Sequence, residues 1–148
     1  MKKITFLLFA VVLTFAGCKK QSNVDRDLII EYIDEHNLDA HSTASGLYYV
    51  IEEEGIGTHP NVFSLVMVKY KGYLLDGTVF DETLANEPIQ FQLHQVIPGW
   101  QEGIQKFKTE GSGKLLIPSE LGYGSDEQSD IPANSVLIFD IELLSFEN

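Results

Sequence analysis

The spacing of hydrophobic residues changes once along this chain, near Gly46. Before that point, residues 27–37 follow a helical period and place four apolar side chains on one side among Asp and Glu: Leu28, Ile29, Tyr32 and Ile33. After it, apolar and polar residues mostly alternate, which is typical of strands that bury one face. The pattern predicts a short N-terminal helix, which Asp25 could cap, followed by a domain built largely of strands.

Strands are predicted where the alternation is strongest and where turn residues interrupt it. They cover residues 47–51, 62–75, 78–81, 88–93, 114–118 and 135–144. Asp76 and Gly77 form a strong hairpin signal between the second and third of these strands. In the last strand, every second residue is apolar and is expected to face the core: Leu137, Phe139, Ile141 and Leu143.

One helical segment interrupts the strands, and it contains the only tryptophan. Trp100, Ile104 and Phe107 fall at positions i, i+4 and i+7, so they share one face of a short helix. Pro98 suits its first turn, where a missing N–H group costs nothing. The simplest arrangement is a sheet folded around this helix. Trp100 could then be a core residue or the flat floor of an apolar pocket, and this segment alone leaves both open.

The first residues resemble a bacterial lipoprotein signal. Lys2 and Lys3 precede an apolar run over residues 4–15, which is shorter than the roughly 20 residues of a membrane-spanning helix. Small residues then lead to Cys18, the position that is acylated in such signals. The alternative is an ordinary cleaved signal followed by a chance cysteine.

Three parts are therefore expected. Residues 1–17 would be the signal peptide, residues 18–45 a lipid-anchored tether with the short helix, and residues 46–148 the folded domain. The polar residues 19–25 would form the tether itself. The anchored protein would lie outside the cytoplasm, attached to a bacterial membrane and facing the periplasm.

Composition narrows the classes of function. The 148 residues include 22 acidic and 10 basic side chains, for a formal net charge of −12. Such a negative surface argues against nucleic acid as a partner and against adsorption to anionic lipid. The single cysteine excludes an internal disulfide and a metal site made of several thiolates. His36 and His41 are five residues apart, so they do not share a helical face, and both are expected to be solvated.

The sequence also lacks the common catalytic motifs. It has no G-x-S-x-G or H-E-x-x-H pattern and no cluster of acidic metal ligands. An enzyme with this sequence would work without metal, cofactor or covalent chemistry.

Aromatic and branched residues gather instead near the predicted turns. The set comprises Tyr70, Phe80, Val96, Ile97, Trp100, Tyr123, Ile131 and Phe139, with Asp81 among them. Each apolar member could be a core residue, and for Phe139 or Val96 alone that interpretation is preferred. Tyr123 fits a core less well, because it lies between glycines in the long polar loop 121–132, and such loops commonly carry function.

Several segments occur together, and in the same order, in a known family. They are VKYKG at 68–72, DG at 76–77, FD at 80–81, QVIPGWQEG at 95–103, LGYG at 121–124, IP at 131–132 and LIFDIELL at 137–144. The chain resembles the FKBP-type peptidyl-prolyl cis-trans isomerases from about Gly46 to Phe146, and the Val-Ile-x-Gly-Trp-x-Glu-Gly element is specific to that family.

The resemblance implies an α+β fold, in which an antiparallel half-barrel sheet wraps around one short central helix. It also implies that Trp100 forms the floor of a substrate pocket. The implied walls are Tyr70, Phe80, Val96, Ile97 and Phe139, with Ile131 closing the pocket from the loop. The Tyr123 hydroxyl and the Ile97 backbone N–H would donate hydrogen bonds to carbonyls of the bound peptide, and Asp81 would be a polar contact at the rim.

Three departures from the family pattern stand out. Ile89 occupies a position that is commonly aromatic in the family, so one wall of the pocket would be thinner here. The short segment 82–87 contains no arginine to pair with Asp81. The acidic loop 125–130 means that the substrate preference of other members cannot be assumed here.

Three functions are compatible with these features. The first is isomerisation of X–Pro bonds in unfolded or partly folded exported proteins, performed by a monomer. The second is a non-catalytic chaperone or peptide-binding module that uses the same pocket. The third is a structural spacer, which would not need the aromatic set at pocket positions.

Overall fold

One antiparallel sheet and one short helix form the body of the protein. The structure is a computed structural model that describes residues 20–84 and 87–148. Its helices are α1 (Gln21–Glu35) and α2 (Pro98–Gly103). Its strands are β1 (His41–Ser42), β2 (Tyr48–Glu53), β3 (Leu65–Tyr73), β4 (Val79–Glu82), β5 (Ile89–Gln92), β6 (Gly111–Ile117) and β7 (Leu137–Glu147). Short 3-10 turns are η1 (Leu93–Gln95), η2 (Ile104–Lys106) and η3 (Ser119–Leu121).

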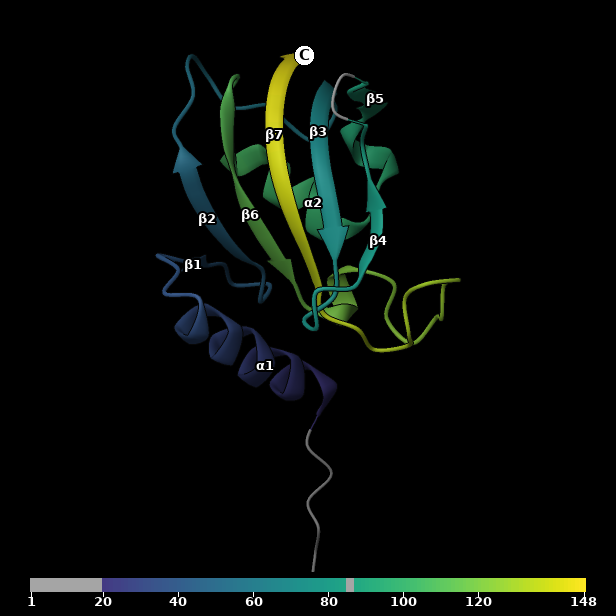
Figure 1. Cartoon of the computed structure of the whole chain (residues 1–148). Coiled ribbons are helices and arrows are strands. Elements are labelled where there is room, and N and C mark those ends of the chain that lie inside the picture. The colour runs from purple at the N-terminus through teal and green to yellow at the C-terminus, as the bar shows by residue number, and fades with distance from the viewer. Residues whose placement is uncertain (1–19, 85–86) are drawn as a thin grey trace, which may run out of the picture.

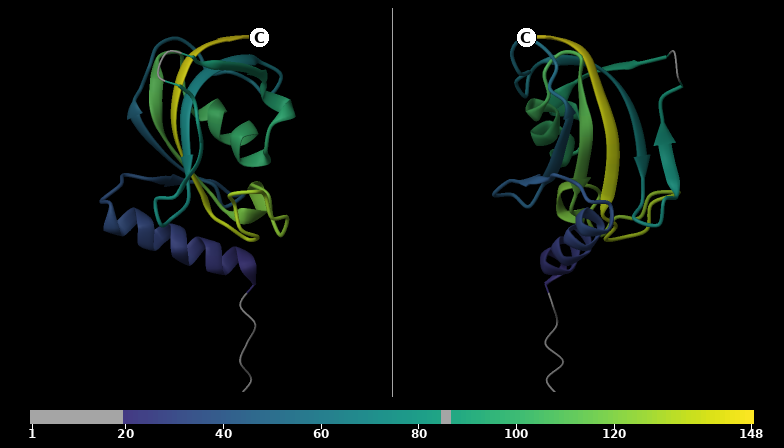
Figure 2. Two further views of the ribbon diagram at one scale, coloured as in Figure 1. Left: turned by 45° about the vertical axis from the view of Figure 1, so that its right-hand side comes forward. Right: turned by 60° about the vertical axis from the view of Figure 1, so that its left-hand side comes forward.

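The strands follow the order β1-β2-β6-β7-β3-β4, and every neighbouring pair is antiparallel. Strand β3 pairs with β7 along one edge, while its other edge is shared between β5, beside Leu65–Val68, and β4, beside Lys71–Tyr73. The sheet curves around α2, which lies on its concave side (Figures 1 and 2). The predicted half-barrel around one central helix is confirmed.

Two glycines allow α2 to lie directly on β6. A Cβ atom on Gly99 would come within 2.4 Å of the Ile117 side chain, and one on Gly103 within 2.6 Å of the Leu115 side chain. Such distances are far inside van der Waals contact, so only hydrogen fits at these positions. This close approach of α2 to β6 fixes how far Trp100, which lies between the two glycines in the sequence, stands from the sheet.

The core follows the periodicity of the sequence. The predicted inward residues of β7 are all buried, whereas Glu142 between them is exposed. Ile104 and Phe107 are also buried, so the predicted helical face is correct, although the α-helix itself ends at Gly103 and continues as a 3-10 turn. A second, smaller cluster on the opposite face of the sheet contains Ile29, Val50, Leu116 and Val136.

Helix α1 differs from its prediction. It begins at Gln21 rather than near residue 27, so the tether interpretation is wrong for residues 21–25. Asp25 is not a cap but an internal helical residue with no exposed surface, and its carboxylate contacts Ser119. The extra turn depends on this tertiary contact, which helical periodicity cannot reveal. Among the described residues, no helix is both long and apolar enough to cross a membrane.

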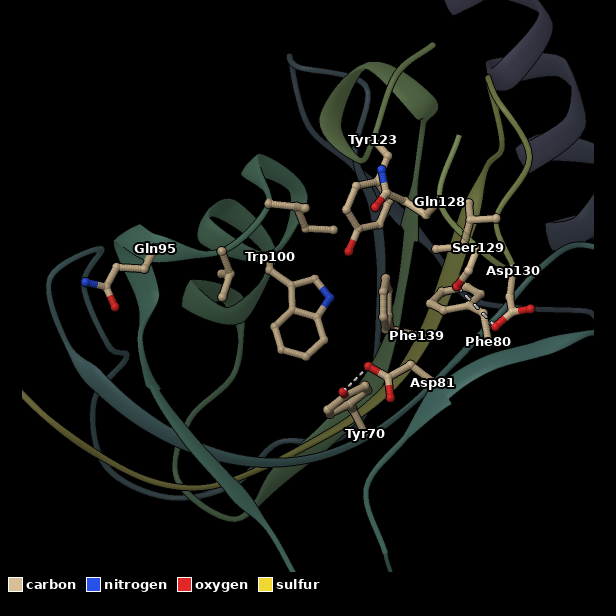
Figure 3. A pocket seen from close by; sticks show the side chains of 13 residues that line it. Tyr70, Phe80, Asp81, Gln95, Trp100, Tyr123, Gln128, Ser129, Asp130 and Phe139 are labelled. Carbon is tan, nitrogen blue, oxygen red and sulfur yellow. Dashed lines mark hydrogen bonds between the residues drawn. The ribbon is translucent and has the colours of Figure 1, made fainter. Parts of the chain in front are cut away.

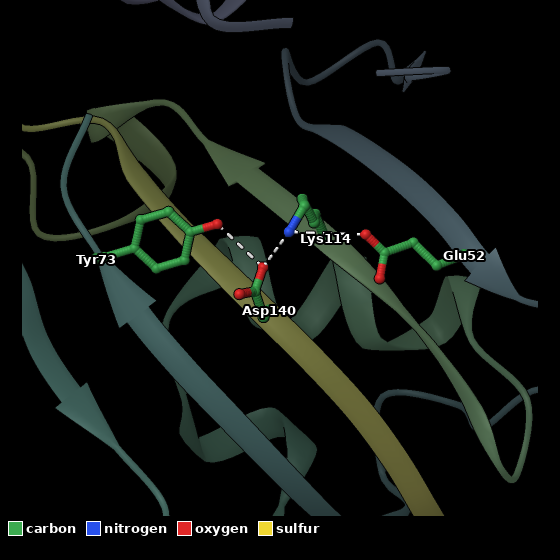
Figure 4. A network of polar contacts seen from close by, with 4 residues as sticks. All are labelled: Glu52, Tyr73, Lys114 and Asp140. Carbon is green, nitrogen blue, oxygen red and sulfur yellow. Dashed lines mark hydrogen bonds and ion pairs between the residues drawn. The ribbon is translucent and has the colours of Figure 1, made fainter. Parts of the chain in front are cut away.

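A polar network joins four strands on the convex face of the sheet (Figure 4). Lys114 Nζ lies 2.5 Å from Asp140 Oδ1 and 3.7 Å from Glu52 Oε1, and the Tyr73 hydroxyl donates to Asp140 at 3.0 Å. Burial alone lowers the pKa of Lys114, but the bond to Asp140 and the nearby carboxylates outweigh it and raise that pKa. Partial burial, with the polar partners, raises the pKa of Tyr73. These groups therefore keep the network intact at neutral pH.

The contact between α2 and β6 can be tested by Gly103→Ala. Alanine normally stabilises a helix by about 0.8–1 kcal/mol relative to glycine. Here the added methyl group would overlap buried Leu115, so we expect a net loss of about 1–3 kcal/mol in the free energy of unfolding, as for other overpacked cores. Urea unfolding would measure it, with Glu102→Ala on the same helix expected to change stability by less than about 1 kcal/mol. A Gly103→Ala protein as stable as wild type would contradict the tight contact.

Candidate active site

A pocket of about 510 Å³ opens between α2, the concave face of the sheet and the loop that follows η3 (Figure 3). All nine residues selected from the sequence, Asp81 included, line it. Four further residues line it as well: Gln95, Gln128, Ser129 and Asp130. The pocket thus combines an apolar interior with a polar rim.

Trp100 forms the floor and is only 5% exposed. Tyr70 and Phe139 meet it nearly edge-on, with ring centroids 5.0 and 5.1 Å away and interplanar angles of 84° and 81°. Phe91 of β5 supports it with a centroid 5.4 Å away. Edge-to-face and tilted ring pairs of this kind are the preferred aromatic geometries, so the indole is held on several sides.

The indole nitrogen of Trp100 is buried and has no hydrogen-bond acceptor among the described residues. In Figure 3 it faces the ring of Phe139. An aromatic face accepts an N–H group only weakly. The floor therefore keeps one buried donor without a strong acceptor, which costs free energy of folding.

Phe80 of β4 and Phe139 of β7 form one wall of the pocket. Their centroids lie 5.5 Å apart at an interplanar angle of 82°. Gly72 makes this possible, because a Cβ at that position would lie 2.6 Å from Phe80 and 2.7 Å from Phe139. Gly72 is paired with both Asp81 and Phe139 across the sheet, so the strand register brings the wall and the rim together.

Asp81 accepts a hydrogen bond from the Tyr70 hydroxyl (Figure 3). The Thr83 hydroxyl and the backbone of Tyr70 also contact one another, which holds β4 beside β3. Burial raises the pKa of Tyr70, and the bond to Asp81 raises it further. Tyr70 is therefore neutral across the physiological range. No ion pair of Asp81 occurs in the described part of the chain, so a tyrosine takes the place of the missing arginine.

The Ile97 N–H and the Tyr123 hydroxyl at the pocket have no acceptor among the described residues. The Ile97 carbonyl accepts the N–H groups of Trp100 and Gln101 at 3.0 and 3.1 Å, which fixes this residue as the start of α2. The Gln101 side chain also donates to the Val96 carbonyl at 2.8 Å. A peptide carbonyl in the pocket would thus meet donors that are already positioned.

Sequence reasoning missed several contributors. Phe91 follows Ile89 by two residues and supports Trp100, whereas Ile89 is 39% exposed and does not line the pocket. Phe91 and Ile89 lie on the same face of β5, so alternation alone could not tell which of them supports Trp100. The rim residues 128–130 gave no sequence signal, because only the closed loop, with a bridge between Gln128 and Ile131, brings them to the pocket.

Apolar side chains and hydrogen-bonding groups make up the lining of the pocket. Among the described residues no histidine lines it, and its two carboxylates are Asp81 and Asp130. Over residues 20–84 and 87–148, no group of three or more His, Cys, Asp or Glu side chains could hold a metal ion. Both expected solvated histidines, His36 and His41, are exposed.

Comparison with known proteins gives a consistent result. Residues 57–144 match the family described as FKBP-type peptidyl-prolyl cis-trans isomerase. The chain is 48% identical over 107 residues to the FKBP-type peptidyl-prolyl cis-trans isomerase FkpA of Aeromonas hydrophila, and 46% identical over 104 residues to FkpA of Escherichia coli (strain K12). These matches cover 72% and 70% of this chain, but only 40% and 38% of the two relatives.

Solved structures agree with the sequence matches. The crystal structure of FkpA from Escherichia coli superposes with a TM-score of 0.72 at 37% identity, covering 86% of this chain and 62% of that one. A peptidyl-prolyl cis-trans isomerase from Pseudomonas syringae pv. tomato superposes with a TM-score of 0.76 at 29% identity, covering 86% and 94%. The chain thus spans about two fifths of the length of the curated relatives it matches.

Phe139→Ala tests the packing of the pocket. Phe139 is 5% exposed and touches three other rings, so its truncation should cost about 3–5 kcal/mol of unfolding free energy. Since Trp100 is the only tryptophan, its fluorescence should also shift to longer wavelength as water reaches the indole. The matched control is Phe63→Ala, because Phe63 is 72% exposed and should cost less than about 1 kcal/mol. Equal effects of the two substitutions would contradict this description of the pocket.

Proposed function

The chain belongs to the family of FKBP-type peptidyl-prolyl cis-trans isomerases, and we propose that it accelerates cis-trans isomerisation of X–Pro bonds. The single observation that carries this proposal is the aromatic pocket, with the unpaired Ile97 N–H and Tyr123 hydroxyl at its edge. Its substrates are proline-containing polypeptides, unfolded or partly folded.

The physical problem is the rotation barrier of the peptide bond. The partial double bond between carbon and nitrogen gives a barrier of about 18–20 kcal/mol. The two isomers of an X–Pro bond differ by only about 0.5–1 kcal/mol, so a catalyst acts on the barrier alone. In the twisted transition state the amide loses resonance, so its oxygen carries less negative charge and the amide group is less polar. An apolar pocket destabilises the planar, more polar amide relative to the twisted one.

Each pocket residue has a role in this proposal. The proline ring lies on Trp100, between walls made by Tyr70, Phe80, Val96, Ile97 and Phe139, and Ile131 closes the pocket from the loop. The Tyr123 hydroxyl and the Ile97 N–H each donate to a carbonyl of the peptide, which holds the backbone on either side while the X–Pro bond turns. Asp81 orients the Tyr70 ring by accepting its hydroxyl hydrogen.

The organisation of the chain is part of the proposal. Residues 46–148 form the isomerase domain, and one copy of the chain is the functional unit in this proposal. The residues before 46 would carry the domain at a membrane outside the cytoplasm. The support for that location is the sequence pattern ending at Cys18, which lies outside the described residues.

Activity can be tested on the full chain with a short X–Pro peptide, by an NMR exchange assay that needs no coupled protease. We expect turnover by wild type, and Phe80→Ala should lower kcat/KM roughly tenfold or more, because a fully used aromatic contact amounts to about 1.5–3 kcal/mol. Asp81→Asn should cost less than Phe80→Ala. The rate should be nearly flat between about pH 6 and 8, since the raised pKa of Tyr70 keeps it protonated and no histidine lines the pocket.

Two results would contradict the proposal. A folded wild-type chain that suppresses aggregation but does not exchange X–Pro isomers would favour the chaperone alternative. A bell-shaped pH profile that Asp81→Asn abolishes, with a larger loss than Phe80→Ala, would assign acid–base work to Asp81. Circular dichroism would verify that each variant is folded.

Lipid attachment at Cys18 is tested in cells by Cys18→Ser. The substitution should move the protein from the membrane fraction to the soluble fraction and abolish incorporation of labelled fatty acid, because several acyl chains contribute about 0.8 kcal/mol per buried CH₂ group. Labelling that persists in the Cys18→Ser protein would show that the anchor is elsewhere. Isomerase activity serves as the control and should not change, since the residues that line the pocket all lie within 70–139.

A further inference from the structure

Helix α1 is joined to the loop of Tyr123 through a buried carboxylate. Asp25 has no exposed surface, and its Oδ2 atom accepts the Ser119 backbone N–H at 2.8 Å and the Ser119 hydroxyl at 2.6 Å. Its other oxygen accepts the Gln21 amide at 2.7 Å. Ser119 is itself 1% exposed. A carboxylate buried to this degree is retained only when its hydrogen bonds offset the loss of water.

The hydrogen bonds continue from Ser119 to both neighbours of Tyr123. The Ser119 carbonyl accepts the N–H of Gly122 at 2.9 Å and the N–H of Gly124 at 2.8 Å. Gly124 has a φ of +59°, a conformation that favours glycine, and its carbonyl accepts the N–H of Asn134 at 2.7 Å, where the loop returns. One residue therefore fixes the backbone on both sides of Tyr123.

The side chain of Tyr123 depends on this backbone support. It is 39% exposed, and its hydroxyl makes no hydrogen bond within the described part of the chain. Figures 1 and 2 show α1 and this loop at the same end of the sheet. The direction in which the hydroxyl points into the pocket is thus set by the turn that Ser119 holds, and Ser119 is held by Asp25.

We propose that Asp25 is a positioning residue for Tyr123, which couples α1 to the active site; this rests on the proposed isomerase function. Asp25 lies outside the family match, which begins at residue 57. Without its carboxylate, two buried donors of Ser119 lose their acceptor. The backbone moves or takes in water to satisfy them, and the Tyr123 hydroxyl loses its alignment with the substrate carbonyl.

The test compares Asp25→Ala in the wild-type and Tyr123→Phe backgrounds of the full chain. Loss of one neutral hydrogen bond to the substrate corresponds to about fivefold in kcat/KM, so Tyr123→Phe should cost about that much, and Asp25→Ala no more. If Asp25 acts through Tyr123, its substitution should change kcat/KM by less than about twofold once the hydroxyl is absent. Asp25→Asn, which keeps an acceptor oxygen, should restore part of the activity.

The matched control is Ile29→Val. Ile29 is fully buried on the same helix and packs in the smaller core cluster, and its side chain cannot accept a hydrogen bond from Ser119, so this variant loosens α1 and should leave kcat/KM unchanged. If Asp25→Ala does not fold, Ser119→Ala replaces it, because it removes the hydroxyl donor and keeps the backbone contacts. Equal losses in both Tyr123 backgrounds, or no loss in a folded Asp25→Ala protein, would overturn the proposal.

A second readout does not depend on catalysis. Amide hydrogen exchange measured by NMR should show faster exchange at Gly122 and Gly124 in Asp25→Ala than in Ile29→Val. An inactive wild-type chain would refute the proposed isomerase function, while this measurement would still report on the contact. Unchanged protection of both glycines in Asp25→Ala would refute the coupling even in an active enzyme.

Discussion

The contact between α2 and β6 is the constraint on which the rest of the pocket depends. Gly99 and Gly103 present no side chain to Ile117 and Leu115, so the helix lies at backbone distance from the strand. Trp100 lies between the two glycines in the sequence. This distance between helix and strand places its ring against the aromatic rings of the sheet. A wider separation would open a gap beneath the indole, and a gap in a close-packed core costs stability. The floor of the pocket is therefore a consequence of packing, which also gives it a fixed orientation.

The walls and rim follow from strand register. Gly72 is paired with Asp81 in β4 and with Phe139 in β7, so three segments distant in the sequence meet at one point of the sheet. The space left by the missing side chain of Gly72 is filled by two rings. A polar pair, Tyr70 and Asp81, lies beside them. This arrangement offers a substrate an apolar shape with hydrogen-bonding groups beside it.

Periodicity predicted most of the fold because the core residues of β7 and α2 repeat with the period of their element. Hydrogen bonds between distant residues were not predictable in this way. Asp25 and Ser119 are 94 positions apart, and a helical pattern cannot distinguish an acidic residue that faces water from one that meets a buried serine. The tether interpretation of residues 21–25 was wrong for this reason.

In the candidate site, too, local sequence patterns were predictive and contacts between distant residues were not. The nine residues selected from the sequence all lie at the pocket, since motif and aromatic character are local signals. Phe91, which packs against Trp100, was missed, because it shares a face of β5 with Ile89 and alternation does not distinguish the two. The partner of Asp81 was also missed, because a tyrosine of the neighbouring strand occupies the place expected of an arginine from the loop.

The central claim is that isomerisation here needs no proton transfer, and the solvent deuterium isotope effect on kcat/KM tests it most directly. A pocket that acts by desolvation and shape moves no proton in the transition state, so the ratio of rates in H₂O and D₂O should be close to 1. General acid–base catalysis by Asp81 or another group would move a proton and give a ratio of about 2 or more. A ratio near 1 in wild type and in Asp81→Asn is the predicted result, and a large ratio that Asp81→Asn abolishes would contradict the account.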